Sequence, residues 1–335
     1  MSYIIFKNVD KYYGDNHVLK GINLSINEGD FVTLLGSSGC GKSTLLRCLA
    51  GLEQVTKGNI YLQGEDITNL RPRDRNIGMI FQQYSLFPNM NVYNNVAFGL
   101  RMKKVDKDII HEEVQKALKL VDLQGYEKRY PYQLSGGEQQ RVALARSIVT
   151  KPKVLLLDEP FNAIDAKLRR ALQVRIKEIH KELNMTSIFV THDQEEAMVM
   201  SDIIHVMKNG VIEQSGTPME IYKHPKGIFT AEFIGSHNLL DKEEFTKLTG
   251  EESTASKIVI RPETIEISSE VFPEGDYYTL FGTIIDVSFK GSIIRYMVKV
   301  KDIVLKVDVL FDDYKIYDLD QKVYLKLAKN HLIEL

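Results

Sequence analysis

Residues 31–51 read FVTLLGSSGCGKSTLLRCLAG: an apolar run, a glycine-rich turn and a helical pattern in succession. The turn, GSSGCGKST at residues 36–44, fits the phosphate-loop pattern G-x-x-x-x-G-K-[ST]. Glycines let a backbone wrap a polyphosphate with its N–H groups pointing inward, and the following helix N-terminus adds a favourable dipole. The stretch therefore predicts a strand–loop–helix unit that binds a nucleotide polyphosphate. The glycine spacing does not fit the G-x-G-x-x-G pattern of dinucleotide sites.

Two side chains of this loop carry specific expectations. Lys42 would bridge the β- and γ-phosphates, and the Ser43 hydroxyl would ligate Mg²⁺. The residues expected to contact nucleotide along the loop are Gly36, Ser37, Ser38, Gly39, Cys40, Gly41, Lys42, Ser43 and Thr44.

A second motif follows the apolar run Val154–Leu157, where Asp158 and Glu159 stand at the expected end of a strand. Open α/β sheets bind ligands at the carboxyl ends of their strands. Asp158 would hold Mg²⁺ through its water shell, and Glu159 would polarise an attacking water. An apolar strand that ends in two acids is common by itself, but beside a phosphate loop it indicates nucleotide hydrolysis.

The first part of the chain, residues 1–235, alternates short apolar runs with longer helical patterns, which predicts an α/β domain with a largely parallel sheet. Within it, residues 85–150 lose the strand signal. There Ile109, Val114, Ala117, Leu118 and Val121 recur at three- and four-residue steps, which predicts a helical subdomain. The predicted strands are residues 31–35, 77–81, 154–157, 187–191 and 203–207.

The remaining residues, 236–335, have a different texture. Residues 236–256 are polar and acidic and indicate a boundary. In the run 294–300, Ile294, Tyr296, Val298 and Val300 would share one face of a strand. Residues 279–287, 303–310 and 322–327 show similar patterns, so we expect a small all-β barrel of the oligonucleotide/oligosaccharide-binding (OB) type.

The third motif is LSGGEQQR at residues 134–141, in which Ser135 would cap a helix that has Glu138 in its first turn. It resembles the LSGGQ signature of the ATP-binding subunits of ABC transporters, with Glu138 in place of the commonest Gln. The resemblance implies that ATP and Mg²⁺ are bound. It also implies that Ser135, Gly136, Gly137 and Glu138 cap the γ-phosphate held by the other subunit of a head-to-tail dimer.

Other landmarks of the resembled family fall in order along the chain. Tyr13 resembles the aromatic residue that stacks on adenine, and Gln82 the loop glutamine that touches Mg²⁺ and the attacking water. His192 resembles the switch histidine at the γ-phosphate, so Glu159, His192 and Gln82 form the expected catalytic set. Residues 162–165, NAID, occupy a loop usually written SALD, whose Asp165 would organise the opposite subunit's phosphate loop.

The resemblance narrows to one importer branch, which carries sugar, polyamine, ferric-ion and phosphonate systems. Its markers are THDQEEA at residues 191–197 and the Arg261-Pro262-Glu263 turn typical of a C-terminal regulatory TOBE module. The short module favours polyamine, ferric ion or aminoethylphosphonate over sugar as the solute. The implied partners are a second copy of the chain, membrane-spanning permease subunits and an extracytoplasmic solute-binding protein. The implied location is peripheral, on the cytoplasmic side of the cell membrane.

Composition restricts the alternatives. With 43 Lys and Arg against 45 Asp and Glu, no field of one sign favours a nucleic-acid partner. Apolar runs reach four residues, far below the ~20 of a membrane span. Two other classes compete: a soluble ABC ATPase not coupled to transport, and an unrelated phosphate-loop enzyme. The sequence shows neither long coiled coils nor a second nucleotide domain, and no Asn-Lys-x-Asp guanine motif. For the β-rich module, regulation, dimerisation and ligand sensing all remain open.

Overall fold

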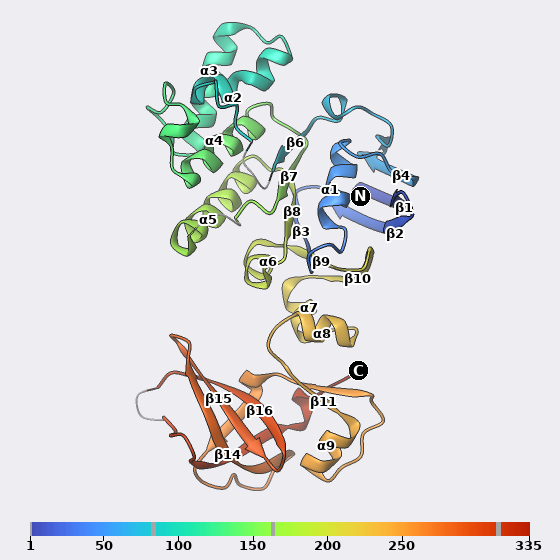
Figure 1. Cartoon of the computed structure of the whole chain (residues 1–335), viewed down its shortest axis with the longest axis vertical. Coiled ribbons are helices and arrows are strands. Elements are labelled where there is room, and N and C mark those ends of the chain that lie inside the picture. The colour runs from blue at the N-terminus through green and yellow to red at the C-terminus, as the bar shows by residue number, and fades with distance from the viewer. Residues whose placement is uncertain (1, 82–84, 162–164, 313–315) are drawn as a thin grey trace. The chain divides into compact units, whose positions relative to one another are not determined.

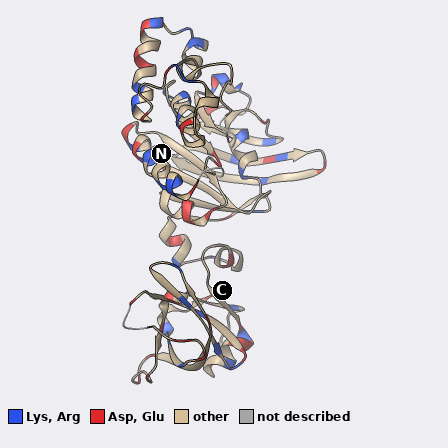
Figure 2. Ribbon diagram, turned by 60° about the vertical axis from the view of Figure 1, so that its left-hand side comes forward, with Lys and Arg blue, Asp and Glu red and all other residues tan. Residues whose placement is uncertain are grey.

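The computed structural model describes residues 2–81, 85–161, 165–312 and 316–335 of the chain (Figure 1). The chain folds into two compact units, residues 1–219 and residues 220–335. Residues 220–235, which the sequence pattern grouped with the first domain, thus lie in the second unit. Figure 2 shows Lys and Arg interspersed with Asp and Glu along the ribbon of each unit.

The centre of the first unit is a six-stranded sheet of order β10-β9-β3-β8-β7-β6. Pairing is parallel throughout except at β10, which is antiparallel to β9. All five strands predicted for a parallel sheet are present. The strands are β3 (Phe31–Gly36), β6 (Ile77–Ile80), β7 (Val154–Asp158), β8 (Thr186–Thr191), β9 (Ile203–Lys208) and β10 (Val211–Gly216).

Both faces of this sheet are covered, which explains the unbroken apolar run of β7. Leu155 and Leu157 face a core shared with the helices of the insert. Val154 and Leu156 face the opposite core, which contains Leu45 of α1 (Lys42–Ala50). Successive side chains therefore anchor β7 in the cores on both of its faces. Asp158 at its end and Glu159 directly after it are attached to a strand that is held firmly in place.

A second sheet, which the sequence reading did not predict, packs on the α1 side. It is antiparallel, with order β2-β1-β4-β5. Its strands are β1 (Ser2–Tyr13), β2 (Asn16–Asn27), β4 (Lys57–Leu62) and β5 (Glu65–Asp66). Phe6 of β1 and Leu24 of β2 join the core that contains Leu45, so α1 packs against both sheets.

The helical insert lies where the sequence predicts it. Its helices are α2 (Val92–Met102), α3 (Lys107–Leu120) and α4 (Gly136–Ile148). The prediction was wrong for one of the apolar residues expected to recur along one helix face. Ile109 is 52% exposed, whereas Ile110 is buried with Val114. The i, i+4 spacing of 110 and 114 places these two side chains on the same face, which explains the difference. Two further helices of the first unit are α5 (Ala166–Glu182) and α6 (Gln194–Met200).

The second unit contains a curled five-stranded antiparallel sheet that fits the expected OB-like fold. Its order is β13-β17-β14-β15-β16. The strands are β13 (Ile265–Ser268), β14 (Tyr277–Phe289), β15 (Ile293–Val300), β16 (Ile303–Leu310) and β17 (Lys322–Ala328). The predicted face of Ile294, Tyr296, Val298 and Val300 is buried.

The polar stretch 236–256, expected to mark the boundary between the two domains, is largely folded into the second unit. Strand β11 (Asn238–Asp241) pairs with β12 (Lys257–Ile260), which also pairs with β18 (Ile333–Glu334). Asp241 and Glu244 form a capping box at the start of α9 (Lys242–Thr249). The polar composition of this stretch therefore reflects a capped helix. The short helices α7 (Pro218–Lys223) and α8 (Ile228–Phe233) precede it.

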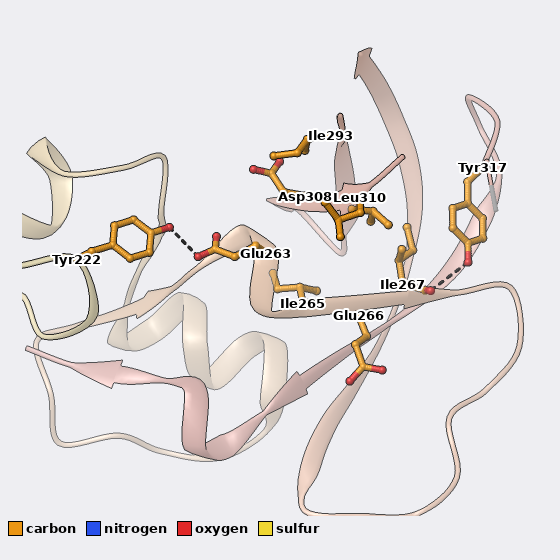
Figure 3. A pocket seen from close by; sticks show the side chains of 10 residues that line it. Tyr222, Glu263, Ile265, Glu266, Ile267, Ile293, Asp308, Leu310 and Tyr317 are labelled. Carbon is orange, nitrogen blue, oxygen red and sulfur yellow. Dashed lines mark hydrogen bonds between the residues drawn. The ribbon is translucent and has the colours of Figure 1, made fainter. Parts of the chain in front are cut away.

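The second unit also holds a groove of about 780 Å³ (Figure 3). Its carboxylates are already engaged: Tyr222 donates to Glu263 at 2.6 Å, and Arg295 pairs with Asp308 at 2.6 Å. Lys326 pairs with Glu266, the remaining carboxylate of the lining. Among the described residues, no helix is long and apolar enough to cross a membrane.

Candidate functional site

The phosphate loop connects β3 to α1 and borders a cleft of about 270 Å³. Gly41 has a φ of 108°, and a Cβ there would lie 2.9 Å from Leu19 and 3.2 Å from the Val18 carbonyl. Only glycine fits this turn without strain. The described residues that line the cleft are Val18, Ser38, Gly39, Gly41, Lys42, Ser43, Thr44 and Glu159. The sequence pattern had not indicated Val18, which belongs to a strand that the pattern missed.

Lys42 is buried at the start of α1, with 4% of its surface exposed. Its ammonium donates to the carbonyls of Gly36 at 2.7 Å and Ser37 at 2.9 Å. A buried cation needs such partners. These contacts hold the ammonium of Lys42 against the start of the phosphate loop, and Lys42 also lines the cleft.

Ser43 and Asp158 bring the first two motifs together. The Ser43 hydroxyl donates to Asp158 Oδ1 at 2.7 Å, and Asp158 is 3% exposed. Arg47 of α1 places a guanidinium nitrogen 3.7 Å from the other carboxylate oxygen. The sequence analysis did not single out this arginine, which faces Asp158 only because α1 packs beside β7.

These two side chains fit a magnesium ion that is shared with phosphates. Hydroxyl and carboxylate oxygens are its preferred protein ligands, and Mg²⁺ usually binds one or two of them together with substrate phosphates and water. Within the described residues, no three His, Cys, Asp or Glu side chains gather as the ligands of a metal ion.

Glu159 and His192 lie beside each other at the ends of neighbouring strands. Glu159 follows β7 in the left-handed region, with a φ of 46°, and its N–H donates to the Val190 carbonyl of β8 at 3.1 Å. Its carboxylate oxygen lies 3.7 Å from His192 Nδ1, and Glu159 also lines the cleft. Non-glycine residues in this conformation are uncommon and often mark functional sites.

Tyr13 stands at the end of β1 and is 44% exposed. The ammonium of Lys11 lies 4.7 Å from the centre of its ring, and Lys11 also pairs with Glu53 at 2.9 Å. Burial, and then the charge of Glu53, raise the pKa of the Tyr13 phenol, while a side-chain interaction with Thr44 opposes the shift. Thr44 lines the cleft, so Tyr13 lies near its rim.

The signature residues lie at the start of α4 in the helical insert, outside the cleft lining given above. Ser135 caps the helix by accepting from the Glu138 N–H at 3.3 Å, and the Glu138 carboxylate accepts from the Ser135 N–H at 2.7 Å. This backbone hydrogen bond lowers the pKa of Glu138. Glu138, which stands where the signature most often has Gln, therefore helps to cap the N-terminus of α4. Ser135 and Gly136 are exposed, and Gly137 is buried.

Several predicted residues lie elsewhere or outside the described part of the chain. Asp165 is exposed and caps α5 by accepting from the Leu168 N–H at 3.0 Å. Gln82 and residues 162–164 lie outside the described residues. Cys40 is buried with its sulfur 3.8 Å from the Lys42 ammonium.

A phosphate loop, with acids at the end of a strand in the same parallel sheet, defines a phosphate-loop nucleotide-binding protein. The family model described as ABC transporter matches residues 19–162, and a TOBE domain model matches residues 258–334. A spermidine/putrescine import ATP-binding protein PotA from Clostridium acetobutylicum is 48% identical over 312 residues, covering 89% of this chain and 87% of the relative. The chain belongs to the ABC transporter ATP-binding proteins, which excludes unrelated phosphate-loop enzymes.

Further comparisons agree. A protein of the same name from Haemophilus ducreyi is 44% identical over 314 residues, 88% of this chain and 84% of the relative. The solved structure of cbiO1 from Clostridium perfringens, part of an ABC transporter complex, matches with a TM-score of 0.62 and 33% identity over 67% of this chain and 91% of its own. A dimeric ATP-binding cassette in a post-hydrolysis state with ADP and Pi has a TM-score of 0.58 and 33% identity, over 64% and 98%. These matches confirm the predicted family and its ATPase class.

Proposed function

We propose that the chain is the ATP-hydrolysing subunit that powers import of polyamines such as spermidine or putrescine. The observation that carries the ATPase part is the Glu159 carboxylate, which lines the nucleotide cleft 3.7 Å from His192. The polyamine part rests on the names of the relatives, which are 44–48% identical over most of both chains.

Binding of ATP would use the phosphate loop and its helix. The loop N–H groups and Lys42 would hold the phosphates, while the Tyr13 ring at the rim would stack on adenine. Ser43 and Asp158 would hold Mg²⁺, which supplies charge neutralisation across the phosphates when bound. Their mutual hydrogen bond already holds the hydroxyl and carboxylate oxygens 2.7 Å apart, close enough to contact the same ion.

Hydrolysis then needs positioning and charge stabilisation rather than covalent catalysis. Glu159 would orient a water and accept its proton, because it is the carboxylate in the cleft lining. His192 would hold the γ-phosphate from the end of the neighbouring strand. Gln82, the third expected catalytic residue, would contact the ion and the water.

The active site would be completed by a second copy of the chain. Ser135 and Gly136 are exposed at the N-terminus of α4, a position suited to an anion. Asp165, exposed at the start of α5, would face the partner's phosphate loop. A solved relative is a dimer. Permease subunits and a solute-binding protein would complete the importer, with this chain at the cytoplasmic face of the membrane.

The decisive experiment tests the role of Glu159 in ATP hydrolysis separately from the identity of the imported solute. Cells that lack the gene are complemented with the parent, Glu159→Gln or the control Glu195→Gln, whose residue is exposed on α6. We expect E159Q to bind ATP but to lose about 100-fold or more in turnover and to abolish labelled spermidine uptake. E195Q should restore both activities.

Two other outcomes would contradict separate parts of the proposal. Parental turnover of E159Q would reject the role of Glu159. Normal spermidine and putrescine uptake in cells that lack the gene would reject the polyamine assignment and leave the ATPase intact. Membrane affinity purification supplies a further check: recovery of the chain alone would favour an ATPase not coupled to transport.

A further inference from the structure

The loop that carries His192, residues 191–193, is closed by one internal hydrogen bond and joined to the start of α6 by two more. The Thr191 hydroxyl accepts from the Asp193 N–H at 3.0 Å and donates to the Glu196 carboxylate at 2.6 Å. Asp193 in turn accepts from the Glu196 N–H at 3.1 Å and caps the helix. The backbone on both sides of His192 is therefore fixed by Thr191, Asp193 and Glu196.

A guanidinium from a different helix faces both carboxylates of this arrangement. Arg169 of α5 places Nη1 3.7 Å from Asp193 Oδ2 and 3.8 Å from Glu196 Oε1. At these distances the attraction is between charges rather than through a hydrogen bond. Glu196 is 6% exposed, so water screens its carboxylate poorly and the nearby cation matters more than at an open surface.

The charge of Glu196 depends on these neighbours. Burial raises the pKa of its carboxyl, and the charge of Asp193 adds to that shift, whereas the Thr191 hydroxyl, Arg169 and His192 oppose it. Loss of the guanidinium would favour the neutral carboxylic acid, which holds the Thr191 hydroxyl less firmly. The effect of Arg169 thus reaches the residue that immediately precedes His192.

Arg169 itself stands in the first turn of α5, one helical turn after Asp165. Its N–H donates to the Asp165 carbonyl at 2.9 Å in the first turn, and the Asp165 side chain caps the same turn. Further along α5, the Lys177 ammonium donates to the Val199 carbonyl near the end of α6 at 2.9 Å. Helix α5 therefore contacts the His192 loop and α6 at two points, and the first is one turn from Asp165.

We propose that Arg169 is a positioning residue that couples the start of α5 to the orientation of His192. The inference rests on the proposed function, in which Asp165 faces the partner copy and His192 contacts the γ-phosphate. Displacement of Asp165 as the two copies close is transmitted through one helical turn and the Arg169 guanidinium to the His192 loop. Closure at one site then sets the histidine of the other site in the dimer.

The test compares Arg169→Gln with Arg169→Lys and with Arg170→Gln, a control at the exposed neighbouring arginine. We expect R169Q to lower kcat by about 10- to 100-fold, the range for a reacting group displaced by up to ~1 Å. The Kd for ATP should stay within about twofold of the parent, and R169K should recover most of the turnover. R170Q should behave as the parent.

A double-mutant cycle distinguishes positioning from general damage. If Arg169 acts through His192, R169Q added to His192→Gln should cost less than about a further twofold in kcat. Full additivity, parental turnover of R169Q, or loss of ATP affinity equal to the loss of kcat would each overturn the proposal. An inactive parent would instead reject the proposed function.

Asp193→Asn provides a second variant if R169Q does not fold. Asparagine caps a helix as well as aspartate does, so D193N keeps the loop but removes one charge that faces Arg169. It should lower kcat with little effect on Kd, and parental turnover of folded D193N would overturn the proposal. The ring signal of His192 in NMR, assigned by its loss in H192Q, should shift in D193N and stay close to that of the parent in R169K and R170Q.

Discussion

The Ser43 hydroxyl of α1 donates a 2.7 Å hydrogen bond to Asp158 at the end of β7 and so joins two residues 115 positions apart in the chain. Each belongs to a separate sequence motif, and the contact makes them one oxygen-rich site. Strand β7 presents Asp158 because both of its faces are buried in separate cores. The packing of α1 beside β7 therefore holds together the hydroxyl and the carboxylate that are proposed to share a magnesium ion.

The first prediction concerns this pair. Asp158→Asn and Ser43→Ala should each lower Mg²⁺-dependent ATP hydrolysis by about 100-fold or more, because each removes a ligand that helps to neutralise the phosphates. Ser43→Thr retains the hydroxyl and should stay within about tenfold of the parent. Titration of turnover against Mg²⁺ checks the result. An unchanged magnesium response in D158N would show that the carboxylate does not hold the ion.

A second prediction separates two neighbouring tyrosines. Tyr13→Ala should weaken ATP binding by about 5- to 150-fold, as expected for the loss of ~1–3 kcal/mol of base stacking. Tyr12 instead stacks on His17 at 3.9 Å, so Tyr12→Ala should leave the affinity close to that of the parent. Equilibrium binding of ATP by calorimetry measures both variants. Equal weakening by the two substitutions would remove the assignment of Tyr13.

A third prediction uses the adjacent glycines of the signature. A Cβ on Gly137 would lie 2.3 Å from Leu168 Cδ2 of α5, whereas a Cβ on Gly136 meets nothing within 4 Å. Gly137→Ala should destabilise the fold by about 1–2 kcal/mol through overpacking. Gly136→Ala should be neutral or stabilising by up to ~1 kcal/mol, because alanine favours helix. Thermal unfolding distinguishes them, and equal midpoints would show that Leu168 moves aside freely.

The fourth prediction concerns acid sensitivity. His205 is buried, and this lowers its pKa from 6.5 to about 4. Since the unfolded chain binds the proton more readily between these values, stability falls as the pH drops from about 6.5 to about 4. From about pH 7.5 to about pH 5.5 the loss from this group alone should be about 1.4 kcal/mol.

His205→Gln, which retains a polar partner for the Ser215 hydroxyl 2.7 Å away, should remove this part of the acid sensitivity. His331→Gln at an exposed position serves as the control. Urea unfolding at the two pH values, followed by circular dichroism, gives the comparison. A difference in H205Q as large as in the parent would place the sensitivity elsewhere.

The residues proposed to carry the chemistry have a stronger signal in the sequence than the scaffold around them. The phosphate loop has fixed spacing, and the acids after β7 follow an unmistakable buried strand. The antiparallel sheet of β1, β2 and β4 was missed, although Ile22, Leu24 and Ile26 alternate in β2 as a half-buried strand requires. In the second unit, Asp241 and Glu244 give the D-x-x-E signal of a helix start that polar composition concealed.

Contacts between residues that are distant in the chain could not be predicted from the sequence. Arg169 and Glu196 belong to helices separated in sequence, and each looks like an ordinary charged surface residue. Their approach depends on how α5 packs beside α6, which no local pattern encodes. The same holds for Arg47 and Asp158, which lie 3.7 Å apart only in the folded sheet.

The backbone bond from Glu159 to Val190 also bears on how the protein responds to heat. It fastens the residue after β7 to β8, whose last residue, Thr191, immediately precedes His192. The amide proton of Glu159 should therefore exchange with solvent only when the central sheet opens. Warming should leave the arrangement of Glu159 and His192 intact until the core melts, so loss of ATP hydrolysis and unfolding of the first unit should follow a single temperature curve.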